Sequence, residues 1–333
     1  MILSPAIIAL MTGLFLLVAM TMSSSCISIR IIRDWDIKSG SEAQLALERK
    51  THLISTVLVF VMCFELFSLF LFIYTVDHIH HLFVGAMCAA GTLNVNAYGY
   101  STLVVKMLSF CLCGLWLILN NTDNQAYDYP LIKSKYKFLL FITGMVLLEA
   151  FLQFNYFMLM EPNLITSCCG ALFSEGSQSI AGDMAALPVR PVKIALYASV
   201  LLTLRTGAYC CVKGKGYRLF AWCSGWLLAL SIAAVISFIA VYFYELPSHH
   251  CPFCLLQKEY YYIGYPLYLS LFGAGIAGVG AGMLDRFKHV PSLSRIIPRA
   301  QRRLCLASMA GFLVFTAIAT YPLLFSGFIL EGY

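Results

Sequence analysis

The segment His249-His250-Cys251-Pro252-Phe253-Cys254 sets two imidazoles directly before a pair of thiols at CxxC spacing. This spacing is typical of redox-active disulfides, and it also supplies half of a tetrahedral zinc site. If Cys251 is the N-cap of a helix, Pro252 takes the first helical position and the thiol faces backbone N–H groups that stabilise a thiolate. Lys258 then lies at i+4 from Cys254 on the same helix face. The segment predicts a redox-active thiol pair, with a metal site and a structural disulfide as alternatives.

Two further segments carry thiols or imidazoles. Cys168 and Cys169 are neighbours, so they form a strained and reducible disulfide, pair with other cysteines, or bind a soft metal. Asp77-His78-Ile79-His80-His81 holds three imidazoles, and Cys88 follows seven residues after the last of them. Such a group suits a copper or zinc site or a proton relay, and histidines at the headgroup level of a membrane are the simpler alternative. In the metal interpretation one site gathers His78, His80, His81, Cys88, His249 and His250 around Cys251 and Cys254.

The elements that must position these side chains are membrane helices. The 333 residues are 60% hydrophobic and 11% charged, with a mean hydropathy of +0.82, which excludes an ordinary soluble protein. The apolar blocks of about 20 residues are long enough to cross the hydrocarbon core as helices, and they lack the two-residue alternation of a membrane β-barrel. We therefore expect an all-α integral membrane protein with eight transmembrane helices, at residues 5–28, 53–76, 101–120, 138–160, 194–212, 219–244, 262–284 and 304–325.

The basic residues predict the orientation of these helices. Of the 22 Lys and Arg residues, 17 lie in the connections 29–52, 121–137, 213–218 and 285–303. The positive-inside rule makes these connections cytoplasmic, so both termini are extracytoplasmic. The outer connections, at 77–100, 161–193 and 245–261, then hold five Cys and five His. We expect a bacterial inner membrane protein with its Cys/His-rich face outside and lipid around it, and no nucleic-acid partner.

The first connection predicts an element of its own. Ser39-Gly40-Ser41-Glu42 has the spacing of a capping box, which predicts a short cytoplasmic helix over 39–50 leading into the second span. That helix is either a solvated connector or a docking surface for a cytoplasmic ATPase or another subunit. The chain has no Gly-rich, Lys-Ser/Thr nucleotide-binding motif, so an ATPase would be a separate polypeptide.

Four charged residues fall inside the expected spans. Glu65, Glu149 and Arg205 lie near mid-span and Lys106 lies nearer an outer end. A charge at the bilayer centre costs roughly 2.5 to 3.5 kcal/mol on insertion scales, so we expect these side chains to face the bundle interior and pair, for instance either glutamate with Arg205. The pairs either bond helices together or form a proton path. Haem is not expected, because every His lies at or beyond the end of a span and no C-x-x-C-H motif occurs.

Spans four to seven resemble the quinone-linked disulfide-generating membrane enzymes, namely disulfide-bond formation protein B and the vitamin K epoxide reductase family. The shared order is a span leading out, a loop with Cys168 and Cys169, two more spans, and then Cys251 and Cys254 before an inward span. The resemblance covers residues 140 to 284. The adjacency of the two loop cysteines, the extra histidines and the four additional spans depart from the family pattern.

This resemblance implies a four-helix bundle in which an outer CxxC exchanges disulfides with loop cysteines and with a thioredoxin-like partner. Its electrons would pass to a membrane quinone. Lys258 stands where the bacterial family has a quinone-side Arg, and we expect Tyr261 and Tyr262 to contact the quinone with it.

We expect three parts in the chain. Residues 1–137 form a three-span half that includes the helix 39–50 and the His/Cys loop 77–100, residues 138–284 form a four-span thiol-redox bundle, and residues 285–333 form a basic loop and the last span. His80-His81 before Gly99-Tyr100, and His249-His250 before Gly264-Tyr265, indicate a four-plus-four repeat.

The leading functional prediction is a membrane thiol–disulfide oxidoreductase that couples Cys251, Cys254, Cys168 and Cys169 to a quinone. One alternative is soft-metal binding or transport through the outer His and Cys residues. Another is a membrane subunit of a larger transport or electron-transfer complex.

Overall fold

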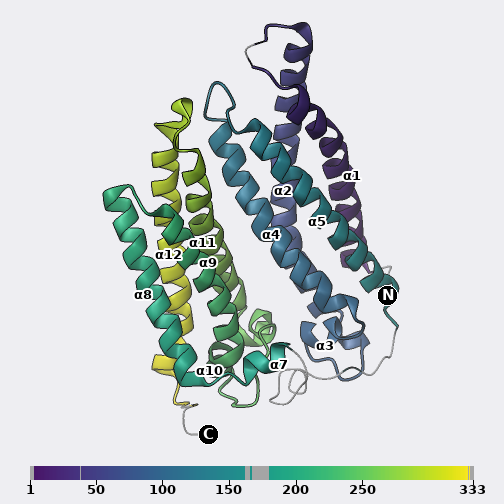
Figure 1. Ribbon diagram of the computed structural model, residues 1–333. Coiled ribbons are helices and arrows are strands. Elements are labelled where there is room, and N and C mark those ends of the chain that lie inside the picture. Colours follow the sequence, from purple (N-terminus) through teal and green to yellow (C-terminus); the bar gives the residue numbers. More distant parts are fainter. Residues whose placement is uncertain (1–3, 38, 162–165, 167–179, 329, 331–333) are drawn as a thin grey trace. The chain divides into compact units, whose positions relative to one another are not determined.

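The computed structural model describes residues 4–37, 39–161, 166, 180–328 and 330 (Figure 1). The regular elements in these ranges are all helices, with no β-strand among them. Eight helical segments are long and apolar enough to cross a membrane, which confirms the predicted all-α membrane fold with eight spans. They cover Pro5–Asp34, Glu42–Leu82, Tyr98–Asp123, Ile132–Met158, Val189–Lys213, Tyr217–Tyr244, Gly264–Phe287 and Ile296–Phe325.

The chain divides into two compact units. Unit 1 comprises Met1–Val76, Leu93–Pro162 and Phe287–Ile297, and unit 2 comprises Asp77–Thr92, Asn163–Arg286 and Pro298–Tyr333. Four spans fall mainly in each unit, so the division is four plus four, while an internal repeat stays a prediction. The grouping differs from the division expected at residue 138, because the fourth span packs with the first and third in unit 1.

Unit 1 contains the long helices α1 (Pro5–Asp34), α2 (Glu42–His78), α4 (Tyr98–Asp123) and α5 (Ile132–Met158). Helix α5 contacts α1 and α4 along its length (Figure 1). The buried core they share consists of Leu17, Ile31, Trp35, Leu58, Met62, Cys113, Trp116, Ile132, Tyr136, Leu139, Ile142 and Val146. A Ser25–Thr143 hydroxyl contact of 2.7 Å bonds α1 to α5 inside this core.

The cytoplasmic helix expected at 39–50 is not a separate element. Helix α2 starts at Glu42 and runs without a break into the second span. The backbone N–H of Gln44 donates to Ser41 Oγ at 3.3 Å, so Ser41 is the residue that caps the helix and Ser39 lies before the cap. The N-cap therefore lies two residues later than predicted, at Ser41.

Two groups of buried charges lie inside unit 1. The Lys135 ammonium lies 2.8 Å from Asp123, near one end of α4 and α5. The Lys106 ammonium lies 2.7 Å from Glu149 and 4.0 Å from Glu65, deeper in the same helices. The expectation that Arg205 pairs with one of the glutamates is wrong, because Arg205 has an exposed side chain on a helix of unit 2.

Unit 2 contains α8 (Val189–Lys213), α9 (Tyr217–Ala234), α11 (Gly264–Leu284) and most of α12 (Ile296–Phe325), together with the short α7 (Ile180–Ala185). Helix α9 contacts both α8 and α11 (Figure 1). Small residues allow the close approach of α11 to its neighbours. A Cβ added at Gly278 would overlap Ser224 of α9, and one added at Gly282 would overlap Ala221.

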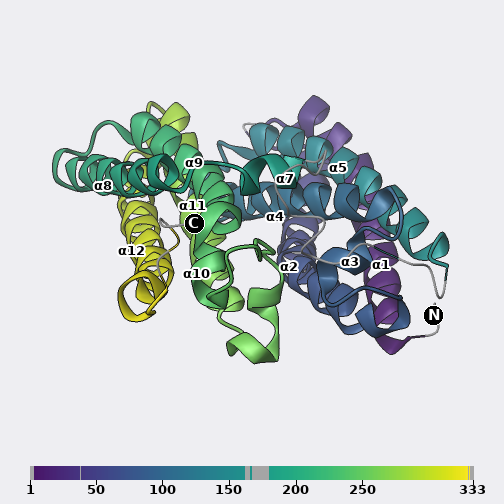
Figure 2. The same ribbon diagram turned by 90° about the horizontal axis from the view of Figure 1, so that it is seen from below.

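The sixth span contains a change of helix type. Helix α9 continues through a π-helical turn, Val235–Ile239, into the short helix α10 (Ala240–Tyr244). All five residues of the π turn are buried. The segment that connects α10 to α11 is drawn in light green in Figure 2, next to α10, and it carries the CxxC pair.

Candidate functional site

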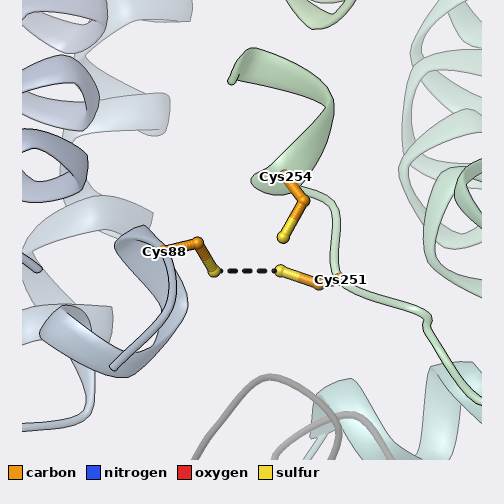
Figure 3. Close-up of side chains that lie close together, drawn as sticks. All are labelled: Cys88, Cys251 and Cys254. Carbon is orange, nitrogen blue, oxygen red and sulfur yellow. Dashed lines mark hydrogen bonds between the residues drawn. The ribbon is translucent and has the colours of Figure 1, made fainter. Parts of the chain in front are cut away.

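Three cysteine sulfurs meet in unit 2 (Figure 3). The Sγ atoms of Cys88, Cys251 and Cys254 all lie within 4.8 Å of one another. The Cys88 and Cys251 sulfurs are 3.5 Å apart, well beyond the ~2.05 Å of a disulfide, and all three residues are thiols. Cys88 and Cys251 are fully buried and Cys254 is 6% exposed. The three sulfurs, here called the thiol cluster, therefore occupy a closed environment.

The two segments that supply the thiol cluster are compatible with the eight-span fold. Cys88 lies between the second and third spans, and the CxxC pair lies between the sixth and seventh. Both connections face the same side of any membrane that all eight helices cross. Cys88 and Cys251, which are 163 positions apart in the sequence, can therefore meet on one side of the membrane.

The CxxC pair lies in a loop and not at the start of a long helix. Cys254–Leu256 is a single 3-10 turn, Gln257 is extended, and α11 begins only at Gly264. The expectation that Cys251 caps a helix with Pro252 at its first position is therefore wrong.

Side chains hold this loop where helical hydrogen bonds were expected. The Tyr244 hydroxyl donates to the Cys251 carbonyl at 2.6 Å, and the Tyr268 hydroxyl donates to the Pro252 carbonyl at 2.7 Å. In a helix these two carbonyls would accept bonds from backbone N–H groups four residues later. Because tyrosines from α10 and α11 occupy them instead, the neighbouring helices set the position of the CxxC pair.

Asp77 joins the Cys88 segment to the CxxC loop. Its Oδ1 atom accepts hydrogen bonds from the Ala89 backbone N–H at 2.9 Å and from Gln257 Nε2 at 3.0 Å. Gln257 Nε2 also donates to the Met87 carbonyl at 3.2 Å. One carboxylate and one amide therefore fix the residues on either side of Cys88 to the residue that follows the CxxC turn.

His249 is the imidazole that lies beside the thiol cluster. Its Nε2 atom is 3.4 Å from Cys254 Sγ. The ring stands edge-on to Tyr244, with the ring centroids 4.6 Å apart, and Tyr260 contacts the same tyrosine at the same separation. Burial raises the pKa of the Tyr260 hydroxyl, and the neighbouring Cys254 sulfur adds to the rise. Tyr260 therefore stays neutral beside the cluster.

His250 serves a different purpose from its neighbour. Its Nδ1 atom lies 2.9 Å from the carbonyl oxygen of Ile236, which belongs to the π turn. A π turn displaces a backbone carbonyl from the regular helical ladder, which leaves it available to a side chain. The change of helix type in the sixth span therefore anchors the loop that carries the CxxC pair.

The other expected histidine ligands do not join the cluster. His78, His80 and His81 do not belong to the three-sulfur group, and among the described residues that is the one such group of potential metal ligands. The Nδ1 atoms of His80 and His81 contact the carbonyls of Asp77 and His78, three residues earlier in the chain. These imidazoles are therefore bound locally at the end of α2.

The residues expected at a quinone are exposed. Lys258 does not share a helix face with Cys254, because Gln257 interrupts the helix between them. Tyr261 is 91% exposed and Tyr262 is 50% exposed, and both have left-handed backbone conformations. Cys168 and Cys169 lie outside the described residues.

No known protein family, curated protein or solved structure matches this chain. Three buried thiols with an adjacent imidazole can hold a thiophilic metal ion, or they can exchange disulfide bonds among themselves.

The sequence carries no signal for the residues that frame the cluster. Tyr244, Tyr268 and Gln257 belong to no recognised motif, and the metal interpretation joined Cys88 to the CxxC pair only together with histidines that lie outside the cluster. Tyrosines are dense around the CxxC pair, but that density does not show which hydroxyls bond back to the loop. The pairing of Cys88 with Cys251 is a long-range contact for which the sequence gives no periodic signal.

Proposed function

We propose that this membrane protein binds a thiophilic metal ion through Cys88, Cys251 and Cys254. The observation that carries the proposal is the convergence of three buried sulfurs from two distant connections within 4.8 Å. Sulfur ligands at about 2.3 Å from a tetrahedral zinc ion lie about 3.8 Å from one another. The 3.5 Å between the Cys88 and Cys251 sulfurs is close to that spacing.

His249 contacts one of the three sulfurs but does not belong to the group of ligand atoms that lie within 4.8 Å of one another. Sulfur and nitrogen ligands of one tetrahedral zinc ion are about 3.6 Å apart. The separation of His249 Nε2 from Cys254 Sγ is 3.4 Å. A shift of the His249 ring toward the other two sulfurs would complete a Cys₃His set, which binds zinc, and the three soft sulfurs by themselves suit cuprous copper.

Burial and charge favour the same interpretation. A protein partner must reach a thiol in order to exchange disulfides with it, and these thiols are 0 to 6% exposed. Metal binding deprotonates the thiols, and in a closed environment a divalent ion would compensate most of the negative charge that this creates.

Metal analysis of the purified protein tests this function. The protein in lipid nanodiscs, prepared anaerobically with a thiol reductant, is loaded with zinc or cuprous copper, and bound metal is measured after chelator washing. We expect one ion per chain in the parent protein and its loss in Cys88→Ser, Cys251→Ser and Cys254→Ser. Cys305→Ser is the matched control, because Cys305 is a buried thiol of α12 that bonds the Gly207 carbonyl. Equal metal content in all variants would contradict the proposal.

The second candidate is thiol–disulfide exchange coupled to a quinone, and a specific observation favours it. The Cys251 sulfur lies within 4.8 Å of two other thiol sulfurs, those of Cys88 from another segment and of Cys254 from its own motif. A Cys88–Cys251 disulfide could thus be attacked by the Cys254 thiolate, which would form Cys251–Cys254 and release the Cys88 thiolate. Formation of either disulfide from two thiols releases two electrons and two protons, which would reduce one quinone to its quinol.

Thiol counting separates the two functions. In the redox case the protein purified without reductant contains a disulfide within the thiol cluster, found by peptide mapping, and an added soluble quinone forms it again after reduction. In the metal case the three thiols are alkylated only after the ion has been removed. A metal-free protein with a quinone-generated Cys88–Cys251 disulfide would replace the metal proposal by the redox one.

A further inference from the structure

A second group of reactive side chains lies in unit 1, where Glu65, Lys106 and Glu149 meet. Lys106 Nζ donates to Glu149 Oε1 at 2.7 Å and to Ser68 Oγ at 2.6 Å, and it lies 4.0 Å from Glu65 Oε1. The three charged side chains are 0 to 1% exposed. They come from α2, α4 and α5, each of which is long and apolar enough to cross a membrane.

The charges of this group do not balance. Two carboxylates and one ammonium give a net charge of −1 when all three are ionised. An uncompensated charge in a low-dielectric interior is costly, so the group must gain a positive charge or lose a negative one. Among the described residues, the other titratable side chain that acts on the group electrostatically is the buried thiol of Cys113 on α4, and a thiol carries no positive charge.

The hydrogen bonds of the group are also incomplete. Both oxygens of Glu65 and Oε2 of Glu149 are buried without a hydrogen-bond partner among the described residues. An ionised carboxylate can only accept hydrogen bonds, so two of them cannot bond to each other, whereas a protonated carboxyl can donate.

Two neutral side chains next to the group are unsatisfied as well. Gln153 lies one turn after Glu149 on the same face of α5, and neither atom of its amide has a partner within the described parts of the chain. Ser109 lies one turn after Lys106 on α4, and its buried hydroxyl has no partner there either. Unsatisfied donors and acceptors thus lie one helical turn from Glu149 on α5 and from Lys106 on α4.

We propose that Glu65 and Glu149 hold one exchangeable proton between them, which makes this group a proton-binding site inside the membrane. The proton resides mainly on Glu65, because the Lys106 ammonium is 2.7 Å from Glu149 and 4.0 Å from Glu65, and the nearer carboxyl is the better stabilised as an anion. With the proton bound, the group is neutral and Glu65 can donate a hydrogen bond. Such a site binds and releases a proton in a proton-coupled step. It shares no residue with the thiol cluster in unit 2.

A carbodiimide probe tests the proposal. Dicyclohexylcarbodiimide adds to a protonated buried carboxylic acid and rearranges to a stable N-acylurea, which peptide mass mapping locates. In nanodiscs at neutral pH we expect modification of Glu65 and its loss as the pH rises. Asp123 is an internal control, because it is equally buried but balanced one-to-one by Lys135 and should stay unmodified.

Two variants test whether Glu65 and Glu149 share the proton. In Glu149→Gln the remaining Glu65 and Lys106 charges balance without a proton, so modification of Glu65 should be lost although Glu65 is still present. In Lys106→Met both glutamates need protons, so both should be modified. Modification of Glu65 that persists in Glu149→Gln would overturn the shared-proton site. Protection of Glu65 by sodium at constant pH would also overturn it, in favour of a metal-cation site.

Thermal unfolding tests the same proposal without a chemical probe that must reach the buried group. A carboxyl that is protonated when folded and ionised when unfolded gives the folded state more bound protons, so stability falls as the pH rises. The unfolding midpoint of the parent protein should therefore drop from neutral to alkaline pH. Glu65→Gln should keep the neutral-pH midpoint and show a smaller drop. Identical pH profiles for the two proteins would contradict the proposal.

Discussion

At the scale of single residues, the most informative side chain is Asp77. Its carboxylate accepts bonds from Ala89 on one segment of the thiol cluster and from Gln257 on the other. Without it, the Ala89 N–H would lose its acceptor, and of the hydrogen bonds described above only that from Gln257 to the Met87 carbonyl would still join the two segments.

Replacement of Asp77 by Ala should weaken the thiol cluster. Loss of an acceptor that serves two donors costs about 1 to 3 kcal/mol. We expect a lower unfolding midpoint and an approximately tenfold weaker zinc affinity, since 1.4 kcal/mol corresponds to one factor of ten. Chelator competition measures the affinity. Asp34→Ala is the control, because Asp34 makes only an exposed contact with Arg33 and should behave like the parent. Unchanged affinity in Asp77→Ala would show that the two segments are held in another way.

The tyrosine hydroxyls that hold the CxxC loop give a second test at this scale. Tyr244→Phe removes the donor to the Cys251 carbonyl and leaves the ring in place. We expect a loss of about 0.5 to 1.5 kcal/mol in stability and faster release of bound metal. Tyr261→Phe, at a side chain that is 91% exposed, should change neither property. Equal behaviour of the two variants, measured by thermal unfolding and metal release, would argue against a positioning role for Tyr244.

At the scale of elements, the existence of the helices was predictable and their ends were not. Eight apolar blocks gave eight spans, because about 20 apolar residues in a row have few alternatives to a membrane helix. Helix α1 nevertheless continues to Asp34 and α12 begins at Ile296, since polar helical turns extend beyond the apolar blocks that were counted. The CxxC segment is held as a loop by tyrosine hydroxyls from two other helices, which bond to its carbonyls. A local pattern of residues cannot predict such contacts.

Small residues on α11 offer a test of helix packing. Gly278→Ala should be destabilising by about 1 to 3 kcal/mol, because its Cβ would overlap Ser224 of α9. Gly273→Ala on the same helix meets nothing within 4 Å and should be neutral or slightly stabilising, since Ala favours helix more than Gly does. Thermal unfolding in one detergent compares the pair. Equal midpoints would mean that α9 and α11 separate easily at Gly278.

At the scale of the whole molecule, the residues that form a unit are not continuous in sequence. The segment 77–92 begins at the end of the second span, whose other residues belong to unit 1, yet it belongs to unit 2 with the CxxC loop. The sequence did predict that thiols and imidazoles gather in connections on one side. It could not predict that Cys88 joins the CxxC pair while His78, His80 and His81 remain apart, because that choice depends on tertiary contacts such as the Asp77–Gln257 bond.

The orientation predicted by the basic residues can be measured with single cysteines. Tyr261→Cys lies in the connection of the CxxC pair and Tyr127→Cys lies in the basic connection after α4, and both positions are highly exposed. A membrane-impermeant maleimide should label the first variant in intact cells and the second only after permeabilisation, each compared with the unsubstituted protein. The reverse pattern would place the thiol cluster on the cytoplasmic side.

The position of Cys88 in the chain also determines when the thiol cluster can be completed during synthesis. A ribosome that has placed Cys88 in the protein must add 163 further residues before Cys251 exists. Four more spans enter the membrane in that interval. Cys88 therefore remains an unassembled thiol while about half of the chain is made. Whatever the cluster binds must arrive after the sixth span is inserted, so maturation of the cluster is a late event in the biogenesis of this protein.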